Sequence, residues 1–323
     1  MALYDLRIIT GNANPKLAAD IAKQLGMQLT DAEVRRFSDG EIRVKINESV
    51  RGADVFVVQP TCPPANDNLV ELLIIMDALK RASARRIVAV IPYYGYARQE
   101  KKTAGREPIT AKLVADLLTT AGADRILVVD LHVPSIQGFF NLPVDHLPAG
   151  PYLAEYLLQA GYGDRNTVVV SPDVGAVGSA AAFADRLQAS LAIIAKRRPE
   201  PNKAEIMEVI GDLDGKRAII VDDMIDTAGS VVTGAEAIRQ RGAAQIYACA
   251  THAVLSGNAV DRLQNSCIEE VVITDTIPLP PEKERPKIKV LSMAPVLAEA
   301  IHRVHDDLSV SNLFDKHWVE DKR

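Results

Sequence analysis

Short runs of β-branched residues alternate along this chain with longer amphipathic stretches, and no other feature of the sequence limits the possible folds so strongly. The run at 54–60 precedes an amphipathic stretch at 68–82, and the run at 86–92 precedes another at 109–122. Such alternation is typical of βαβ units, which form parallel sheets covered by helices. The sequence therefore predicts an α/β protein.

The two halves of the chain contain similar strand-like runs in the same order. The matching pairs are 54–60 with 167–173, 86–92 with 191–199, and 125–132 with 217–224. Because the distance between partners shrinks along the chain, the pattern indicates an old duplication of one domain rather than a solenoid of short repeats. We predict two similar, doubly wound α/β domains, each with a parallel central sheet.

Length and punctuation indicate the domain limits. A chain of 323 residues accommodates about two domains, and the Pro and Gly residues at 147–151 are typical of a boundary. We expect an N-terminal domain over 1–147 and a C-terminal domain over 148–300. A last helix and tail over 301–323 should pack on the N-terminal domain.

Charge and cysteine content exclude several classes of protein. The formal net charge of −5 provides no basic field to attract nucleic acid or an anionic membrane, so any phosphate binding has to be local. Cys62, Cys249 and Cys267 are far apart and odd in number, which suits a reducing compartment. Neither a secretory signal nor a membrane-spanning apolar run is evident in the sequence. We expect a cytoplasmic protein without nucleic-acid or membrane partners.

The segment 217–242 contains the strongest chemical signal: an apolar strand, two adjacent acids, a third acid, and a Thr-Ala-Gly-Ser loop that begins a helix. Amides and hydroxyls at a helix N-terminus can bind a phosphate dianion, and Gly229 permits its close approach. Asp222 and Asp223 can accept hydrogen bonds from neighbouring sugar hydroxyls. The predicted ribose 5-phosphate pocket consists of Asp222, Asp223, Asp226, Thr227, Ala228, Gly229 and Ser230. The weaker alternative is a plain strand end followed by Thr227 as a helix N-cap.

The acids and loop at 222–230 resemble the binding loop for 5-phosphoribosyl 1-diphosphate (PRPP) in type I phosphoribosyltransferases. From about residue 5 to residue 314, the chain resembles class I ribose-phosphate pyrophosphokinases. The strings that carry this second resemblance are RRFSDGEIRVKINESVRG (35–52), NDNLVELLIIMDALKRASA (66–84), IPYYGYARQEKK (91–102), REPITAKLVADLL (106–118), IQGFFNLPVDHL (136–147), KRRPEPNKAEIMEVIGD (196–212) and SVSNLF (309–314).

The resemblance implies a duplicated phosphoribosyltransferase type I fold and an Mg²⁺-dependent ribose-phosphate diphosphokinase. The 1-hydroxyl of ribose 5-phosphate would attack the β-phosphorus of ATP, AMP would leave, and PRPP would supply nucleotide, histidine and tryptophan biosynthesis. Two rivals stay open: a catalytically weak regulatory subunit of the same fold, of the synthase-associated type, and a phosphoribosyltransferase that consumes PRPP. The retained set Lys196, Arg198, His132 and Asp173 disfavours the first, and the duplicated half with its YGYARQ string disfavours the second.

The resemblance also implies which residues bind ATP and its metal. The FSDGE string approaches the adenine from a neighbouring subunit, and residues after two strands contact the phosphates. The implied set is Phe37, Asp39, Glu41, Arg98, Gln99, Lys101 and His132. His132 and Asp173 are the implied metal contacts, Lys196 and Arg198 would neutralise charge on the transferred group, and Asp226 is a candidate base. From the residues alone, a turn at FSDGE, a solvated basic face at 98–102 and a core histidine at 132 remain alternatives.

Members of the resembled class form hexamers that respond to ADP and inorganic phosphate, so we expect that assembly and those effectors here. The implied regulatory residues are Ser49, Arg51, Ser83, Ser309, Ser311 and Phe314. Four residues depart from the usual pattern of the class, namely Ala104, Ser135, Ala176 and Ser179. A cation is expected at the last of these positions, and its loss would weaken phosphate binding.

Overall fold

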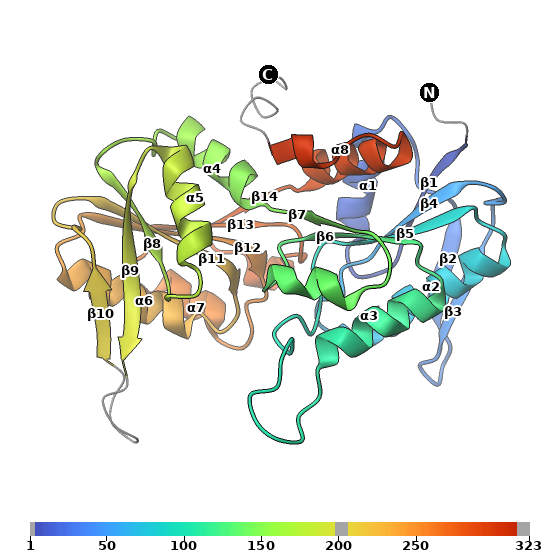
Figure 1. The fold of residues 1–323 in the computed structure, drawn as a ribbon, viewed down its shortest axis with the longest axis horizontal. Helices are drawn as coiled ribbons and strands as arrows, with labels where there is room; N and C mark the ends of the chain where they lie inside the picture. The colour runs from blue at the N-terminus through green and yellow to red at the C-terminus, as the bar shows by residue number, and fades with distance from the viewer. Residues whose placement is uncertain (1–3, 198–205, 315–323) are drawn as a thin grey trace. The chain divides into compact units, whose positions relative to one another are not determined.

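The computed structural model describes residues 4–197 and 206–314 (Figure 1). This part of the chain divides into two compact units. Unit 1 holds the residues up to Pro148, Thr276–Pro278 and the residues from Ser292 onward, and unit 2 holds Ala149–Asp275 and Leu279–Leu291. None of the helices among the described residues combines the length and the apolar character that a membrane crossing requires.

Unit 1 is built on five parallel strands with helices on both faces. Their order is β1 (Leu6–Thr10), β4 (Asp54–Val58), β5 (Arg86–Ile91), β6 (Arg125–Val129) and β7 (Val144–Leu147). One face carries α1 (Pro15–Gln24) and α8 (Ala294–His305), and the other carries α2 (Ala65–Arg81) and α3 (Thr110–Ala121) (Figure 1). The strands β2 (Ala32–Arg36) and β3 (Ile42–Ile46) form a separate antiparallel hairpin, and a 3₁₀ helix spans Pro134–Phe139.

Burial explains why these segments form a two-faced sheet. All five residues of β4 are buried, as expected for a central parallel strand covered on both sides. Val55 and Val57 pack in one cluster with Leu72 and Ile75 of α2, and with the buried face of α3. The β-branched runs of the sequence thus become strands because both of their faces find apolar partners.

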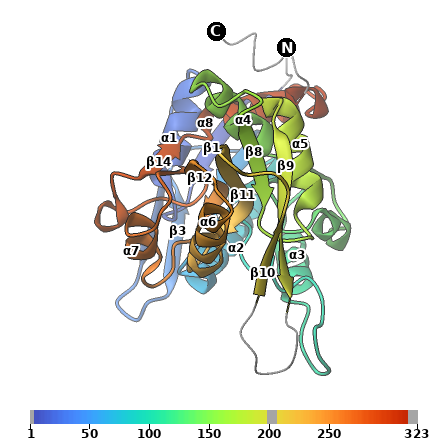
Figure 2. The same ribbon diagram turned by 90° about the vertical axis from the view of Figure 1, so that its left-hand side faces the viewer.

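Unit 2 contains a seven-stranded sheet. Its order is β10 (Ile206–Ile210), β9 (Ser190–Arg197), β8 (Thr167–Ser171), β11 (Arg217–Ile225), β12 (Gln245–Ala253), β13 (Glu270–Thr274) and β14 (Ile288–Leu291). Only β10 is antiparallel to its neighbour. The helices are α4 (Gly150–Gln159), α5 (Val177–Leu187), α6 (Gly229–Gln240) and α7 (Ala259–Gln264), with a 3₁₀ turn at Pro281–Lys283. In Figure 2, which is turned by 90° from Figure 1, the strands and helices of this unit face the viewer. The buried faces of α6 and α7 share one apolar cluster with the strands.

The two sheets confirm a duplication but correct the predicted strand pairs. In each unit, one parallel strand is followed by an antiparallel pair, β2–β3 or β9–β10, and then by four further parallel strands in sequence order. The counterpart of β4 is therefore β11, and the counterpart of β8 is β1. The predicted match of 54–60 with 167–173 is therefore wrong, and so are the other two pairs, because the counterparts of β5 and β6 are β12 and β13. Apolar β-branched runs resemble one another whatever their place in a sheet. Sequence similarity between such runs therefore could not show which strand of one unit is equivalent to which strand of the other.

The last helix of each strand series belongs to the other unit. Helix α4 follows β7 of unit 1 but packs against α5 in unit 2. Helix α8 follows β14 of unit 2 but packs against α1 in unit 1. The two units therefore exchange equivalent helices, and neither is a continuous stretch of chain.

Candidate functional site

The predicted site residues of unit 2 follow the carboxyl ends of neighbouring strands. Asp173 lies just beyond β8, and Asp222 and Asp223 lie near the end of β11, which is hydrogen bonded to β8. Ligands of open parallel sheets bind at this edge, where the loops between strands and helices are free to form a crevice. The predicted sugar loop, residues 226–230, joins β11 to α6 at the same edge.

The backbone of the sugar loop adopts a conformation that is unusual at the start of a helix. Helix α6 begins at Gly229, and its N-cap is Ala228 in the left-handed region at φ 60°. The alternative of Thr227 as the N-cap is therefore wrong, and no side chain caps this helix. A left-handed alanine costs about 1–3 kcal/mol and persists where the surroundings fix it, commonly at ligand sites. The carbonyl of Thr227 accepts a hydrogen bond from Arg262 at 3.0 Å, which holds the loop from behind.

The chain itself leaves room beside Gly229. A Cβ atom added there would meet Arg262 Nη1 at 3.6 Å and Thr227 Oγ1 at 3.8 Å, which are ordinary contacts. Its φ angle is not among the positive ones, so the backbone does not require glycine either. Neither crowding nor backbone strain therefore requires glycine here, and close approach of a ligand stays the prediction made from the sequence.

Three carboxylates interact at the ends of β8 and β11. Burial, followed by the neighbouring charge of Asp223 and, more weakly, of Asp173, raises the pKa of Asp222 to about 8. Asp222 Oδ1 accepts the backbone N–H of Asp223 at 2.8 Å. Hydrogen bonds from sugar hydroxyls or a nearby cation would favour the charged form of such a carboxyl group. The arrangement therefore suits a polyhydroxylated, cation-associated ligand.

Asp173 is held by its own loop. Its Oδ1 accepts the amides of Gly175 and Ala176 at 2.8 and 2.9 Å, and its carbonyl accepts the hydroxyl of Ser171 at 2.7 Å. Ala176 is the N-cap of α5, and Ser179 is exposed in its first turn. The described residues contain no group of three or more His, Cys, Asp or Glu side chains in metal-binding geometry. Mg²⁺ often takes only one or two carboxylates together with waters and substrate phosphates, and an exposed Asp173 fits that role.

The predicted ATP residues of unit 1 lie beyond β5 and β6, which are adjacent strands. Arg98, Gln99 and His132 are all exposed, so the alternative of a core histidine is wrong. Lys101 pairs with Glu100 at 3.1 Å. Burial alone would raise the pKa of Glu100, but the hydrogen bond from Lys101 and the charges of Lys101 and His132 lower it. Because the charge of His132 acts on Glu100, the segment after β5 and the end of β6 lie close together.

The FSDGE string forms the tip of the β2–β3 hairpin. Phe37 and Glu41 face each other through a backbone hydrogen bond of 2.8 Å, and Asp39 Oδ1 accepts the amide of Glu41 at 3.1 Å. The predicted turn is therefore present. Phe37 is 51% exposed, and the Arg43 guanidinium lies 6.0 Å from the centroid of its ring. An exposed aromatic ring on a rigid turn can stack against a flat ligand.

The predicted regulatory residues of unit 1 gather at the opposite, amino-terminal edge of its sheet. The amide of Gly52, next to Arg51, donates to the carbonyl of Ser83 at 3.0 Å. The side chains of Ser309 and Ser311 are hydrogen bonded at 2.7 Å. Ser49 is exposed just before this edge, and the side chain of Phe314 lies outside the described residues.

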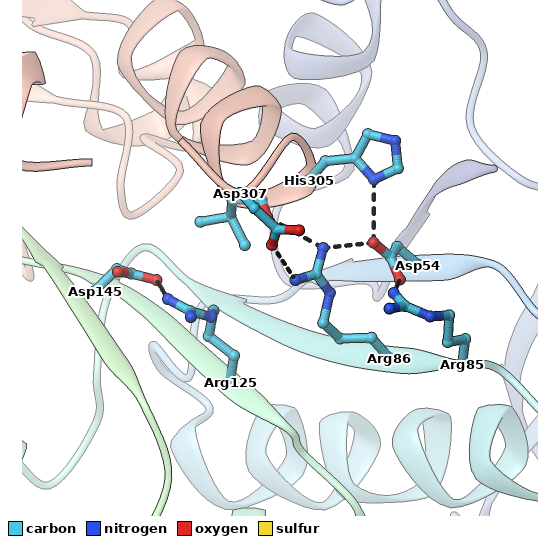
Figure 3. Close-up of polar contacts among 8 residues, drawn as sticks. Asp54, Arg85, Arg86, Arg125, Asp145, His305 and Asp307 are labelled. Atoms are coloured by element: carbon cyan, nitrogen blue, oxygen red, sulfur yellow. Dashed lines mark hydrogen bonds and ion pairs between the residues drawn. The ribbon is translucent and has the colours of Figure 1, made fainter. Parts of the chain in front are cut away.

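A buried carboxylate at this edge was not predicted from the sequence. Asp54, the first residue of β4, is 1% exposed and contacts Arg85 at 2.8 Å, Arg86 at 2.5 Å and His305 at 3.1 Å. Arg86 also contacts Asp307 at 3.3 Å and donates to the carbonyl of Val304 at 3.1 Å (Figure 3). This Asp54 cluster fixes the end of α8 to β4 and β5. A partly exposed ion pair, Arg125 with Asp145, joins β6 to β7.

Two predicted catalytic residues, Lys196 and Arg198, lie partly or wholly outside the described residues. Lys196 belongs to the backbone of β9, opposite Met207 of β10, and its side chain lies outside the described residues. Arg198 lies outside them altogether. The amide of Ser256 donates to the carbonyl of Asp226 at 2.9 Å, which fixes the backbone of the candidate base.

Sequence reasoning also missed a buried polar network at the carboxyl edge of unit 1. Glu71 of α2 is 3% exposed and accepts the Asn12 amide at 2.6 Å and the side chains of Asn12 and Gln59 at 2.9 Å each. A Cβ added at Gly11 would lie 2.3 Å from Gln59 Oε1. Side chains of the chain itself thus fill the space beside Gly11 and Asn12, at the carboxyl ends of β1 and β4.

Comparisons with known proteins agree over nearly the whole chain. Residues 6–122 match the family described as the N-terminal domain of ribose phosphate pyrophosphokinase, and residues 198–315 match the phosphoribosyl synthetase-associated domain. The ribose-phosphate pyrophosphokinase of Caldanaerobacter subterraneus subsp. tengcongensis is 63% identical over 316 residues, which cover 97% of this chain and 100% of the relative. That of Bacillus subtilis is 54% identical over 310 residues, or 96% of this chain and 97% of the relative.

A solved structure shares the fold. The crystal structure of phosphoribosylpyrophosphate synthetase from Mycobacterium smegmatis matches with a TM-score of 0.89 and 47% sequence identity. The match covers 94% of this chain and 99% of the other.

Proposed function

The chain belongs to the ribose-phosphate pyrophosphokinase family, and from this membership we propose how its residues carry out the reaction. The enzyme converts ATP and ribose 5-phosphate into AMP and PRPP, a product used in nucleotide biosynthesis. The observation that carries the residue assignment is the left-handed Ala228 in a loop with open space at Gly229, adjacent to interacting carboxylates. That combination favours a ligand with both a phosphate and neighbouring hydroxyls.

Ribose 5-phosphate binds to unit 2. The amides and hydroxyls from Thr227 to Ser230 bind its 5-phosphate at the start of α6, because a helix N-terminus attracts anions. Asp222 and Asp223 accept hydrogen bonds from the 2- and 3-hydroxyls, which orients the 1-hydroxyl. Those bonds favour the charged form of Asp222, so sugar binding releases a proton from a carboxyl group whose pKa is about 8.

ATP binds to residues of unit 1. Arg98, Gln99 and Lys101 contact its phosphates, and the exposed ring of Phe37 stacks on the adenine bound to a neighbouring copy, with Asp39 and Glu41 accepting from its amine. Transfer of a phosphoryl group depends on positioning and on charge neutralisation more than on covalent catalysis. Lys196 and Arg198 neutralise the transferred diphosphoryl group, and Asp226 accepts the proton of the 1-hydroxyl.

Mg²⁺ is the cofactor. Asp173 and His132 would hold it with oxygens of the ATP phosphates, and it would withdraw charge from the β-phosphorus that is attacked. The exposed carboxylate of Asp173, already oriented by two amides, supports this role. The alanine at position 176 is compatible with activity, because it contacts Asp173 through its backbone amide, which most residue types would supply. The serine at position 179 should weaken phosphate binding without removing the sugar loop or Asp173.

The assembly is a hexamer, and ADP and phosphate act at its regulatory residues. Support comes from the gathering of Arg51, Ser83 and the Ser309–Ser311 pair at the edge of the sheet remote from the ATP residues. A cytoplasmic location accords with the lack of a disulfide bond at Cys62, Cys249 and Cys267, all of which lie among the described residues.

Product formation tests the assignment. Purified protein with ATP, Mg²⁺ and ribose 5-phosphate, with and without inorganic phosphate, should form AMP and PRPP in equal amounts. Lys196→Ala should abolish this activity, whereas Lys289→Ala, which removes an exposed lysine from β14, should not. ATP binding without turnover in any condition would instead favour the regulatory-subunit function. Activity that requires added PRPP and a nucleobase would favour a phosphoribosyltransferase.

A further inference from the structure

The segment between β5 and α3 is closed at its tip by one carboxylate. Glu107 Oε2 accepts the amide of Thr103 at 2.7 Å, the hydroxyl of Thr103 at 2.8 Å and the amide of Ala104 at 2.9 Å. The hydroxyl of Thr103, followed by these two amides, lowers the pKa of Glu107. The group is therefore an anion at every pH at which the enzyme would work, and it draws residues 103–107 into a closed turn.

The base of the same segment is anchored separately. The backbone carbonyl of Gln99 accepts the amide of Ala111 at 3.2 Å, and the side-chain Oε1 of Gln99 accepts the hydroxyl of Thr110 at 2.5 Å. The hydroxyl of Tyr94 donates to the carbonyl of Ala111 at 2.9 Å. These bonds fix residues 94–99 against the start of α3 whether or not the tip is closed. The contribution of Glu107 can therefore be tested without loosening the base.

The tip cannot be held by burial. Residues 101–106 are all exposed, and the Lys101 side chain is 73% exposed. Arg106 nevertheless has a left-handed backbone at φ 67°. A strained, exposed residue keeps a single conformation only where nearby interactions over-determine it. The three hydrogen bonds to the adjacent Glu107 are the interactions that do so.

We propose that Glu107 is a positioning residue for ATP: it keeps residues 101–106 ordered before the nucleotide binds, so that Lys101 meets the phosphates from a fixed place. This inference rests on the proposed function of the segment. A loop that is ordered in advance spares the ligand the entropic cost of ordering it, and affinity rises accordingly. Glu107 itself touches no substrate in this scheme.

The kinetic test compares Glu107→Ala and Glu107→Gln with wild type. Glu107→Ala should raise KM for ATP by roughly tenfold, because the phosphates must then order the loop. Its kcat and its KM for ribose 5-phosphate should stay within about twofold of wild type, since neither depends on the tip once ATP is bound. Glu107→Gln keeps one acceptor oxygen and should fall between the two. Asp116→Ala, which removes an exposed carboxylate from α3, is the matched control and should change none of these values.

A second measurement needs no activity. Lys101, Lys102 and Arg106 are trypsin sites within the closed segment. In the absence of substrates, Glu107→Ala should be cut at these sites about tenfold faster than wild type or Asp116→Ala, because cleavage requires the loop to open. Mass spectrometry identifies the bonds that are cut, and the thermal midpoint checks that the rest of the protein is intact.

The two measurements separate failure of the inference from failure of the function. Equal cleavage of Glu107→Ala and wild type would overturn the ordering by Glu107, whether or not the protein makes PRPP. Faster cleavage with an unchanged KM for ATP, or with a loss confined to kcat, would overturn the positioning role. If the wild type formed no PRPP, the proposed function would fail, and with it the link to ATP, while the cleavage rates would still decide whether Glu107 closes the loop.

Discussion

Removal of Asp54 should destabilise the protein far more than removal of an exposed ion pair. The Asp54 carboxylate is 1% exposed and contacts Arg85, Arg86 and His305, of which Arg86 is 18% and His305 is 9% exposed. Asp54→Ala removes the buried counter-ion of the Arg86 guanidinium and leaves that guanidinium only its contact with the exposed Asp307. Breaking a buried pair from one side costs about 3–5 kcal/mol. For a unit of this size, that corresponds to a fall of roughly 10 °C in the unfolding midpoint.

Exposure predicts an order among the variants of the Asp54 cluster. Arg86→Ala should approach the cost of Asp54→Ala, whereas Arg85→Ala should cost much less, since the Arg85 side chain is 41% exposed and water replaces its partner. Thermal and urea unfolding followed by circular dichroism measure these differences. The control is Asp20→Ala, which breaks the exposed Lys16–Asp20 pair on α1. If Asp54→Ala and Asp20→Ala lowered the midpoint equally, the argument from burial would be refuted.

Three further predictions concern single groups. The pKa of Asp222 is raised to about 8 in the folded protein, so its contribution to stability is present below pH about 4 and is lost as pH rises through 8. Asp222→Asn should therefore gain in thermal midpoint over wild type as pH increases from 5 to 9 in metal-free buffer, and a constant difference would contradict this. Burial raises the pKa of the Cys62 thiol to about 11, and Cys249 is equally buried, so a disulfide reagent at pH 8 should label only the half-buried Cys267 before denaturation and all three cysteines after it. Gly95→Ala places a Cβ atom 2.4 Å from the Thr61 carbonyl and should cost about 1–3 kcal/mol of stability, measured by urea unfolding against Gly105→Ala, where the space is open.

Local patterns predicted the elements because the relevant physics is local. The runs at 54–60, 86–92 and 217–224 form strands, and 109–122 forms a helix within one residue of its predicted ends. The loop at 226–230 was recognised because glycine, hydroxyls and acids have specific uses at a helix N-terminus. The left-handed backbone of Ala228 was seen only in the structure, because alanine does not favour that conformation and so gives no sign of it in the sequence.

Long-range features could not be predicted in the same way. Asp54 and His305 are separated by 251 positions, and neither Arg85 nor Arg86 stands out in a sequence with 37 basic residues. The buried Glu71 lies on a helix where a glutamate is unremarkable by propensity. The register of the duplication was wrong because it depends on sheet order rather than on strand composition. The residue roles at the site, from Phe37 to Ser230, stay predictions until the substrates are bound.

The exchanged helices α4 and α8 set the timing of folding during synthesis. The strands of unit 1 are complete once residue 147 has been made, but α8 spans Ala294–His305. At about 5–20 residues per second, a ribosome needs roughly ten seconds or more to bridge that interval. Until then the apolar face that α8 covers is exposed, Asp54 lacks its contact with His305, and Arg86 lacks its contact with Asp307. A chain that terminated before Ala294 would lack the helix that packs against α1 in unit 1, however much of unit 2 it contained.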